Sequence, residues 1–132
     1  MTLDHVAIWT DQLEILKDFY VRYFYGRPNQ KYRNPKTGLE TYFITFESGT
    51  KLEIMTLPEL AENKNGTNLP YKGITHLAFA VETMQEVDEK ANHLETGRFQ
   101  ILKGPRKTGD GFYEFETLDP DGNRIEVTTV FR

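Results

Sequence analysis

Two short stretches of the chain repeat one pattern: Leu3-Asp4-His5-Val6-Ala7-Ile8 and Ile74-Thr75-His76-Leu77-Ala78-Phe79. Their histidines, at positions 5 and 76, lie 71 residues apart. Each stretch is short and apolar, and a helix start signal follows within about seven residues. A histidine in an apolar strand is uncommon, so a repeated one predicts that two copies of a module build one site.

The repeat extends well beyond the histidines. The offset of 71 also separates Gly26 from Gly97, and an offset of 73 separates Glu53 from Glu126. The difference of two residues predicts a small insertion between the helix and the final hairpin of the second copy. Each copy is expected to contain a strand, a helix and two or three further strands.

Hydrophobic periodicity and turn residues place these elements along the chain. Asp11 with Glu14 resembles a capping box, and Thr83 with Glu86 is one, so each pair predicts a helix start. Expected strands cover residues 3–9, 41–46, 51–57, 74–81, 99–103, 111–118 and 123–130, and expected helices run over 11–25 and from Thr83 to Gly97. Residues 27–39 and 104–111 are rich in glycine, proline or asparagine and predict loops.

The length fits one domain built from two modules. The chain has 132 residues, enough for a sizeable core. We expect one domain over 1–132, with module 1 at 1–57, a linker at 58–72 and module 2 at 73–132. The predicted fold class is α+β.

Composition narrows the range of partners and sites. There are 16 basic and 20 acidic residues, a formal net charge of −4, which argues against nucleic acid or an anionic membrane as partner. No apolar run is long enough to span a membrane, and no signal peptide is visible, so a cytoplasmic location is expected. The chain contains no cysteine, so any metal ligands must be His, Asp or Glu.

Strand alternation places the two histidines and two glutamates on corresponding faces. Glu53 and Glu126 each stand between two large apolar residues, which are expected to face the helices. Each glutamate would then face the same side as His5 or His76. Imidazole and carboxylate suit Ni²⁺, Zn²⁺, Fe²⁺, Co²⁺ or Mn²⁺, so the pattern indicates one divalent metal ion with positions open to substrate or water.

The chain resembles the vicinal oxygen chelate superfamily, the glyoxalase I/bleomycin-resistance/extradiol-dioxygenase group. The resemblance covers nearly the whole chain, and its most specific segment is the last. The residues that carry it are 3–8, Asp18-Phe19-Tyr20 before Gly26, Lys51-Leu52-Glu53-Ile54, 75–79 and Asp119-Pro120-Asp121-Gly122-Asn123-Arg124-Ile125-Glu126-Val127. It implies two βαβββ modules that form a curved mixed sheet around a metal-binding cleft.

The resemblance also implies residue roles. In the glyoxalase I pattern the metal ligands run His, Glu, His, Glu, and His5, Glu53, His76 and Glu126 match all four. The metal would bind neighbouring substrate oxygens, and Glu126 or Glu53 would be the catalytic base that moves a proton between adjacent carbons. The implied activity is that of a lactoylglutathione lyase-like enzyme acting on a small substrate such as a 2-oxoaldehyde hemithioacetal.

The chain differs from glutathione-using relatives at two places, so the resemblance does not identify the thiol that forms the hemithioacetal. Glutathione-using relatives tend to carry Arg four residues after the first histidine, where this chain has Trp9, which we expect to line the substrate site. They also carry a segment with Asn and Trp after the first Glu, where this chain has residues 55–58, Met-Thr-Leu-Pro.

Other members of the group offer alternatives. A dioxygenase or an antibiotic-modifying transferase would use two His and one Glu, and a bleomycin-binding protein would use no metal. Family members often form homodimers in which modules from two chains pair. We therefore expect a homodimer, and the site could lie within one chain or between two.

Overall fold

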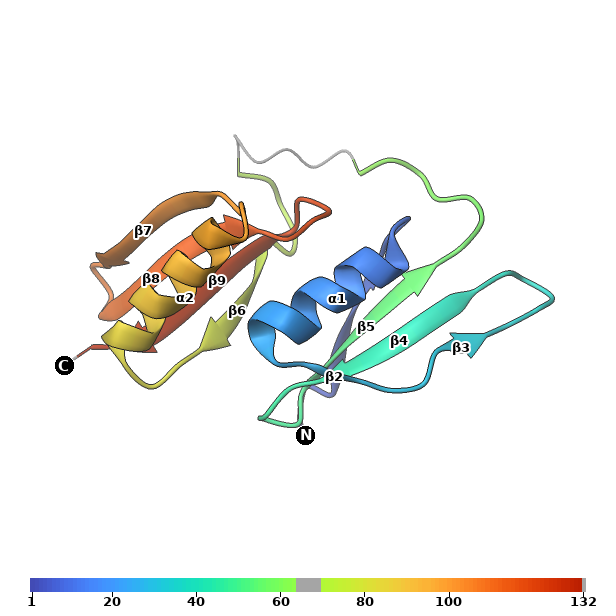
Figure 1. Cartoon of the computed structure of the whole chain (residues 1–132), viewed down its shortest axis with the longest axis horizontal. Coiled ribbons are helices and arrows are strands. Elements are labelled where there is room, and N and C mark those ends of the chain that lie inside the picture. The colour runs from blue at the N-terminus through green and yellow to red at the C-terminus, as the bar shows by residue number, and fades with distance from the viewer. Residues whose placement is uncertain (64–69, 132) are drawn as a thin grey trace. The chain divides into compact units, whose positions relative to one another are not determined.

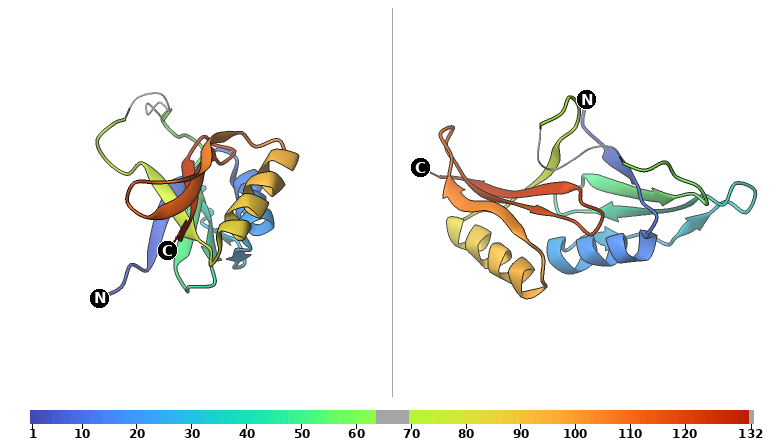
Figure 2. Two further views of the ribbon diagram at one scale, coloured as in Figure 1. Left: turned by 90° about the vertical axis from the view of Figure 1, so that its left-hand side faces the viewer. Right: turned by 90° about the horizontal axis from the view of Figure 1, so that it is seen from above.

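The computed structural model describes residues 1–63 and 70–131. The chain divides into two compact units, residues 1–63 and 64–132. In each unit one helix lies on one face of that unit's own sheet (Figure 1 and Figure 2). The predicted α+β class with two repeated modules is confirmed.

The first unit contains one helix and a mixed sheet. Its elements are β1 (His5–Trp9), α1 (Leu13–Phe24), β2 (Arg27–Pro28), β3 (Tyr32–Arg33), β4 (Glu40–Thr45) and β5 (Lys51–Thr56). The strand order is β1-β5-β4-β2, and β3 also pairs with β4. β1 runs parallel to β5, and the other pairs are antiparallel.

The second unit repeats this order. Its elements are β6 (His76–Ala80), α2 (Met84–Thr96), β7 (Ile101–Lys107), β8 (Phe112–Leu118) and β9 (Arg124–Val130). The strand order is β6-β9-β8-β7, with β6 parallel to β9. In both units, therefore, the first strand is paired in parallel with the last.

Each core lies between the helix and one face of the sheet. α1 packs on β4 and β5, and α2 packs on β7, β8 and β9. The buried strand residues alternate with partly exposed ones, as at Leu52 and Ile54 on either side of Glu53. Burying each such side chain stabilises the fold by about 1.5–3 kcal/mol. Burial of these neighbours directs the intervening residue to the face that the helix leaves uncovered.

The two helix starts differ in how they are capped. The predicted capping box of Thr83 and Glu86 is confirmed, with both reciprocal hydrogen bonds present. The predicted box of Asp11 and Glu14 is wrong: α1 is capped at Gln12 without a side-chain hydrogen bond. The reason is that the Glu14 carboxylate points toward β4 and Lys31 instead of its own helix start.

Gly26 follows α1 for a reason other than the one that usually favours glycine after a helix. The left-handed residue at this helix end is Tyr25, with φ of 56°. A Cβ atom on Gly26 would lie 2.3 Å from the Ile44 side chain on β4. Close approach of α1 to the sheet, rather than backbone conformation, therefore requires glycine here.

Two predicted loops contain strand residues. Residues 27–39 include β2 and β3, which pair with β4 at the edge of the sheet. Residues 104–107 belong to β7, which begins at Ile101 rather than residue 99. β7 continues past the glycine because its register with β8 shifts between Lys103 and Arg106. A Cβ atom on Gly104 would lie 2.4 Å from the Glu114 carbonyl oxygen, so only glycine fits there.

The expected linker at 58–72 falls partly on residues 64–69, outside the described residues. Its limits and those of the two modules therefore remain predictions. Within the described parts of the chain, no helix has both the length and the apolar character that crossing a membrane requires.

Candidate functional site

The first unit brings His5 to Glu53 on the uncovered face of its sheet. In the parallel pairing of β1 and β5, Ala7 lies beside Glu53. His5 lies two residues before Ala7 on β1, so the two side chains share one face of the sheet. The small alanine side chain leaves the space between imidazole and carboxylate open. His5 Nε2 and Glu53 Oε1 lie 4.0 Å apart, and the two side chains are 41% and 18% exposed.

The second unit brings His76 to Glu126 in the same way. Ala78 lies beside Glu126 in the parallel pairing of β6 and β9. His76 Nε2 and Glu126 Oε2 lie 3.4 Å apart, with the side chains 34% and 14% exposed. The repeat in the sequence thus corresponds to a repeated His–Glu pair in the structure.

The other ring nitrogen of each histidine contacts the preceding residue. His5 Nδ1 lies 2.8 Å from Asp4 Oδ2, and His76 Nδ1 lies 2.9 Å from Thr75 Oγ1. Sequence reasoning missed both contacts. The available signal was a residue with a hydrogen-bonding side chain directly before each histidine.

Charges on the second sheet act on the Glu126 carboxyl. Burial raises its pKa above the ordinary value, and His76 opposes this increase. The neighbouring Glu114 and Glu116 carboxylates raise the pKa further, and Arg106 lowers it. The carboxyl is therefore a better proton acceptor than an exposed glutamate, because burial and neighbouring negative charge both favour its protonated form.

The surroundings of the two pairs differ in polarity. Beside the first pair, Trp9 on β1 is 50% exposed and lies next to Met55 in the β1–β5 pairing. Phe43 on β4 lies opposite Glu53. This face of the first unit therefore offers aromatic and apolar surface to a ligand.

Beside the second pair the surface is charged. Arg124 Nη1 donates a hydrogen bond to Glu116 Oε2 at 3.1 Å and forms an ion pair with it. Glu114 accepts a hydrogen bond from Thr128. Glu116 is thus paired with a cation on the same sheet, and Glu114 with a hydroxyl group.

The structure brings the four predicted ligands together two by two. Among residues 1–63 and 70–131 there is no group of three or more His, Asp or Glu side chains placed to hold a metal ion. The donor set of each pair nevertheless fits a divalent ion. Two ligand atoms about 2.1 Å from a tetrahedral ion lie about 3.4 Å apart, which is the separation seen in the second pair. The first pair, at 4.0 Å, needs a small side-chain rotation.

The family follows from a comparison of the whole sequence. A model of the Glyoxalase/Bleomycin resistance protein/Dioxygenase superfamily matches residues 2–127. The chain belongs to this superfamily. The resemblance seen in the sequence is therefore confirmed, and members of the superfamily commonly bind a divalent metal ion. No curated protein is significantly similar to the chain in sequence.

Solved structures of the superfamily share the fold over nearly the full chain. A glyoxalase family protein from Bacillus cereus has a TM-score of 0.85 and 12% identity, covering 100% of this chain and 95% of its own. A glyoxalase family protein from Enterococcus faecalis has a TM-score of 0.77 and 22% identity, covering 97% of both chains. Lactoylglutathione lyase from Agrobacterium tumefaciens has a TM-score of 0.69 and 21% identity, covering 96% and 92%. At these identities the likeness shows the fold alone.

Proposed function

We propose that this superfamily member is a metal-dependent lyase or isomerase of the glyoxalase type. The observation that carries the proposal is the His–Glu pair at the same position of both units, His5 with Glu53 and His76 with Glu126. Four ligands in two matching pairs are the complete glyoxalase I pattern. Family members with a binding role alone have no need of such a set.

The proposed cofactor is one divalent ion, Ni²⁺, Zn²⁺, Fe²⁺, Co²⁺ or Mn²⁺. Its proposed ligands are the first pair, His5 and Glu53, and the second pair, His76 and Glu126. The two units could come from one chain or from the two chains of a homodimer, which we propose as the functional form. Mixing His5→Ala with His76→Ala chains separates these arrangements. Recovery of activity in the mixture indicates sharing between chains, and absence of recovery indicates sites within one chain.

The proposed chemistry is proton transfer between two neighbouring carbons of a small molecule. The bound ion would act as a Lewis acid on the substrate oxygens. Glu126 is the proposed base, with Glu53 as the second candidate. Glu126 is 14% exposed and lies among other carboxylates, so it accepts a proton more readily than a fully solvated glutamate. General-base catalysis of this kind contributes about 10²–10⁴-fold to the rate.

The proposed substrate is a 2-oxoaldehyde hemithioacetal, or another small molecule with oxygens on adjacent carbons. The half-exposed Trp9 ring, four residues after His5, gives the first pair an aromatic neighbour. An apolar part of the substrate is therefore expected to contact Trp9. The expected setting is the cytoplasm, with no nucleic acid or membrane as partner.

A metal-resolved assay tests this function. Chelator-treated protein is reloaded with Ni²⁺ or Zn²⁺ and assayed with methylglyoxal and several thiols in parallel. We expect turnover with at least one thiol and a loss of about 10²-fold or more in kcat for Glu126→Gln. His93→Ala on α2 is the matched control, since it removes the third histidine of the chain and leaves both pairs intact. Equal turnover in wild type, Glu126→Gln and the metal-free protein would refute the proposal.

One distance favours a second enzymatic function, a dioxygenase or an antibiotic-modifying transferase of the same superfamily. His5 and Glu53 lie further apart than His76 and Glu126, at 4.0 Å against 3.4 Å. A ligand set of two histidines and Glu126 would leave Glu53 out. If Glu53→Gln keeps the metal affinity of the wild type, this second function is preferred, and a large loss of affinity favours the lyase.

A further inference from the structure

The His5 ring is held on two sides. Its Nδ1 atom lies 2.8 Å from Asp4 Oδ2. The Phe43 ring packs against it edge to face, with ring centroids 5.4 Å apart and an interplanar angle of 86°. The ring therefore has one polar neighbour at Nδ1 and one aromatic neighbour that limits its rotation.

The chemistry of the Asp4 contact decides which nitrogen of His5 carries hydrogen. An ionised carboxylate only accepts hydrogen bonds, so Nδ1 must donate. A neutral imidazole has a single N–H, which leaves Nε2 with a free lone pair. Nε2 is the nitrogen that faces Glu53, at 4.0 Å. This is the form of histidine that binds a metal ion through Nε2.

Asp4 is itself held in place by Lys51 on the neighbouring strand. Lys51 Nζ donates to Asp4 Oδ1 at 3.1 Å, so each carboxylate oxygen of Asp4 has its own partner. The Lys51 main-chain N–H also donates to the Asp4 carbonyl oxygen, at 3.0 Å. Lys51 thus holds the main chain of Asp4 through its own backbone and the carboxylate through its side chain.

His76 has a different neighbour at the same place. Thr75 Oγ1 lies 2.9 Å from His76 Nδ1. A hydroxyl group both donates and accepts hydrogen bonds, so it accommodates either neutral form of the ring. On the other side, Glu126 Oε2 lies 3.4 Å from Nε2, where a carboxylate attracts an N–H. The repeat has therefore kept the histidine but not the group that decides its tautomer.

We propose that Asp4 is a positioning residue that fixes His5 in the Nδ1–H form, with Nε2 ready to bind a divalent cation, and that Thr75 does not fix His76. The part of this inference that concerns cation binding rests on the proposed function. The part that concerns the tautomer is a property of the metal-free protein. The two histidines are then unequal: the tautomer of His5 is set before a cation binds, whereas the neighbouring Thr75 does not set that of His76.

The tautomer is measured directly in metal-free, ¹⁵N-labelled protein at about pH 8, where free imidazole is neutral. Ring nitrogen shifts distinguish N–H from bare nitrogen, and His76→Ala and His93→Ala assign the signals. We expect His5 in the Nδ1–H form in the wild type and in the exposed control Asp11→Ala, and a mixture of forms in Asp4→Ala. Lys51→Met should give an intermediate result. Bare Nδ1 in the wild type, or an unchanged tautomer in Asp4→Ala, would overturn the proposal.

Calorimetric titration with Ni²⁺ supplies the second measurement. We expect Asp4→Ala to weaken binding about 10–100-fold, as is typical for residues that orient a metal ligand, and Thr75→Val to weaken it less than about 3-fold. Equal losses in the two variants would contradict the inferred inequality. Absence of Ni²⁺ binding by the wild type would refute the proposed function, while the ring-nitrogen measurement would still decide the role of Asp4. Both substitutions lie at exposed positions, and a thermal melt confirms folding.

Discussion

Ala78 lies directly beside Glu126 in the parallel pairing of β6 and β9, so the residue paired with Glu126 on β6 carries only a methyl group. The position is exposed. Ala78→Leu should therefore leave the fold intact and fill the space between His76 and Glu126. We expect Ni²⁺ affinity to fall by at least about 10-fold. The control Ala80→Leu lies beside Thr128, away from the carboxylate, and should bind normally. Calorimetric titration checks both, and equal affinity in the two variants would contradict the proposed site.

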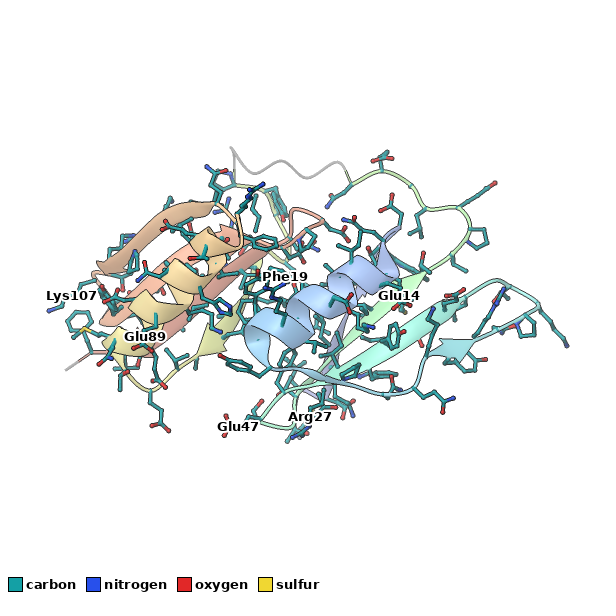
Figure 3. The ribbon with its side chains drawn as sticks, viewed as in Figure 1. Glu14, Phe19, Arg27, Glu47, Glu89 and Lys107 are labelled. Carbon is teal, nitrogen blue, oxygen red and sulfur yellow. The ribbon has the colours of Figure 1, made fainter. Side chains whose placement is uncertain are left out.

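Glu14 lies on α1 (Figure 3) and forms the centre of a charged cluster that joins the helix to β4. Lys31 Nζ lies 2.7 Å from its carboxylate, and the Tyr42 hydroxyl donates to it at 3.0 Å. The hydrogen bond from Lys31 is the main cause that lowers the pKa of Glu14 from 4.5 to about 2. Because the pKa of Glu14 is lower in the folded protein than in the unfolded chain, ionised Glu14 stabilises the fold at pH values above the unfolded pKa. This stabilisation is lost as pH falls from about 4.5 to about 2.

Glu14→Gln should consequently lower the melting temperature at neutral pH and make no difference near pH 2. The side chain is half exposed, so solvent screening limits the effect to about 1 kcal/mol. Glu59→Gln, at an exposed position of the same unit, is the control. Thermal melts across this pH range check the prediction, and a constant difference between Glu14→Gln and wild type at every pH would refute it.

Asp119 is a buried carboxylate that shapes the turn before β9. Its Oδ1 accepts hydrogen bonds from the main-chain N–H groups of Asp121 and Asn123, and its Oδ2 accepts one from the Asn123 side chain, each at 2.9 Å. Asp119→Ala leaves these donors without their acceptor and should cost about 2–4 kcal/mol. Asp119→Asn keeps one acceptor oxygen and should cost less. Denaturant unfolding measures both, and equal stability of the two variants would show that the carboxylate does not hold the turn.

Trp9 is expected to contact substrate rather than metal. Its ring is 50% exposed on the face that carries His5. Trp9→Ala should raise KM by roughly 5–30-fold, which corresponds to about 1–2 kcal/mol of lost contact. Ni²⁺ affinity should stay at the wild-type level. Trp9→Phe retains an aromatic ring and serves as the matched control. An unchanged KM in Trp9→Ala would remove this residue from the substrate site.

The repeated pattern made most of the fold predictable. Alternation around Glu53 and Glu126 gave the correct buried face, because burying large apolar neighbours leaves only one direction for the residue between them. The offset of the two modules likewise predicted that the order of strands and helix along the chain is repeated, as it is. Where the sequence misled, a contact distant in sequence prevailed. Glu14 contacts Tyr42, 28 residues away, and so is not part of a capping box.

The site could be predicted only in part. Residue type and repeat position identified both His–Glu pairs, since each pair lies within two adjacent strands. The contacts of Asp4 and Thr75 were not predicted, because a side chain next to a strand residue can adopt several directions and the sequence does not select one. The role of Gly104 depended on the approach of the Glu114 carbonyl from β8, which no local signal reveals.

Equilibrium binding of Ni²⁺ to chelator-treated protein tests the central claim most directly. We expect about one ion per chain for the wild type and for His93→Ala. We expect at least about 100-fold weaker binding for His5→Ala and for His76→Ala, because each removes one imidazole ligand. Substoichiometric metal in the wild type, unchanged in His76→Ala, would contradict it.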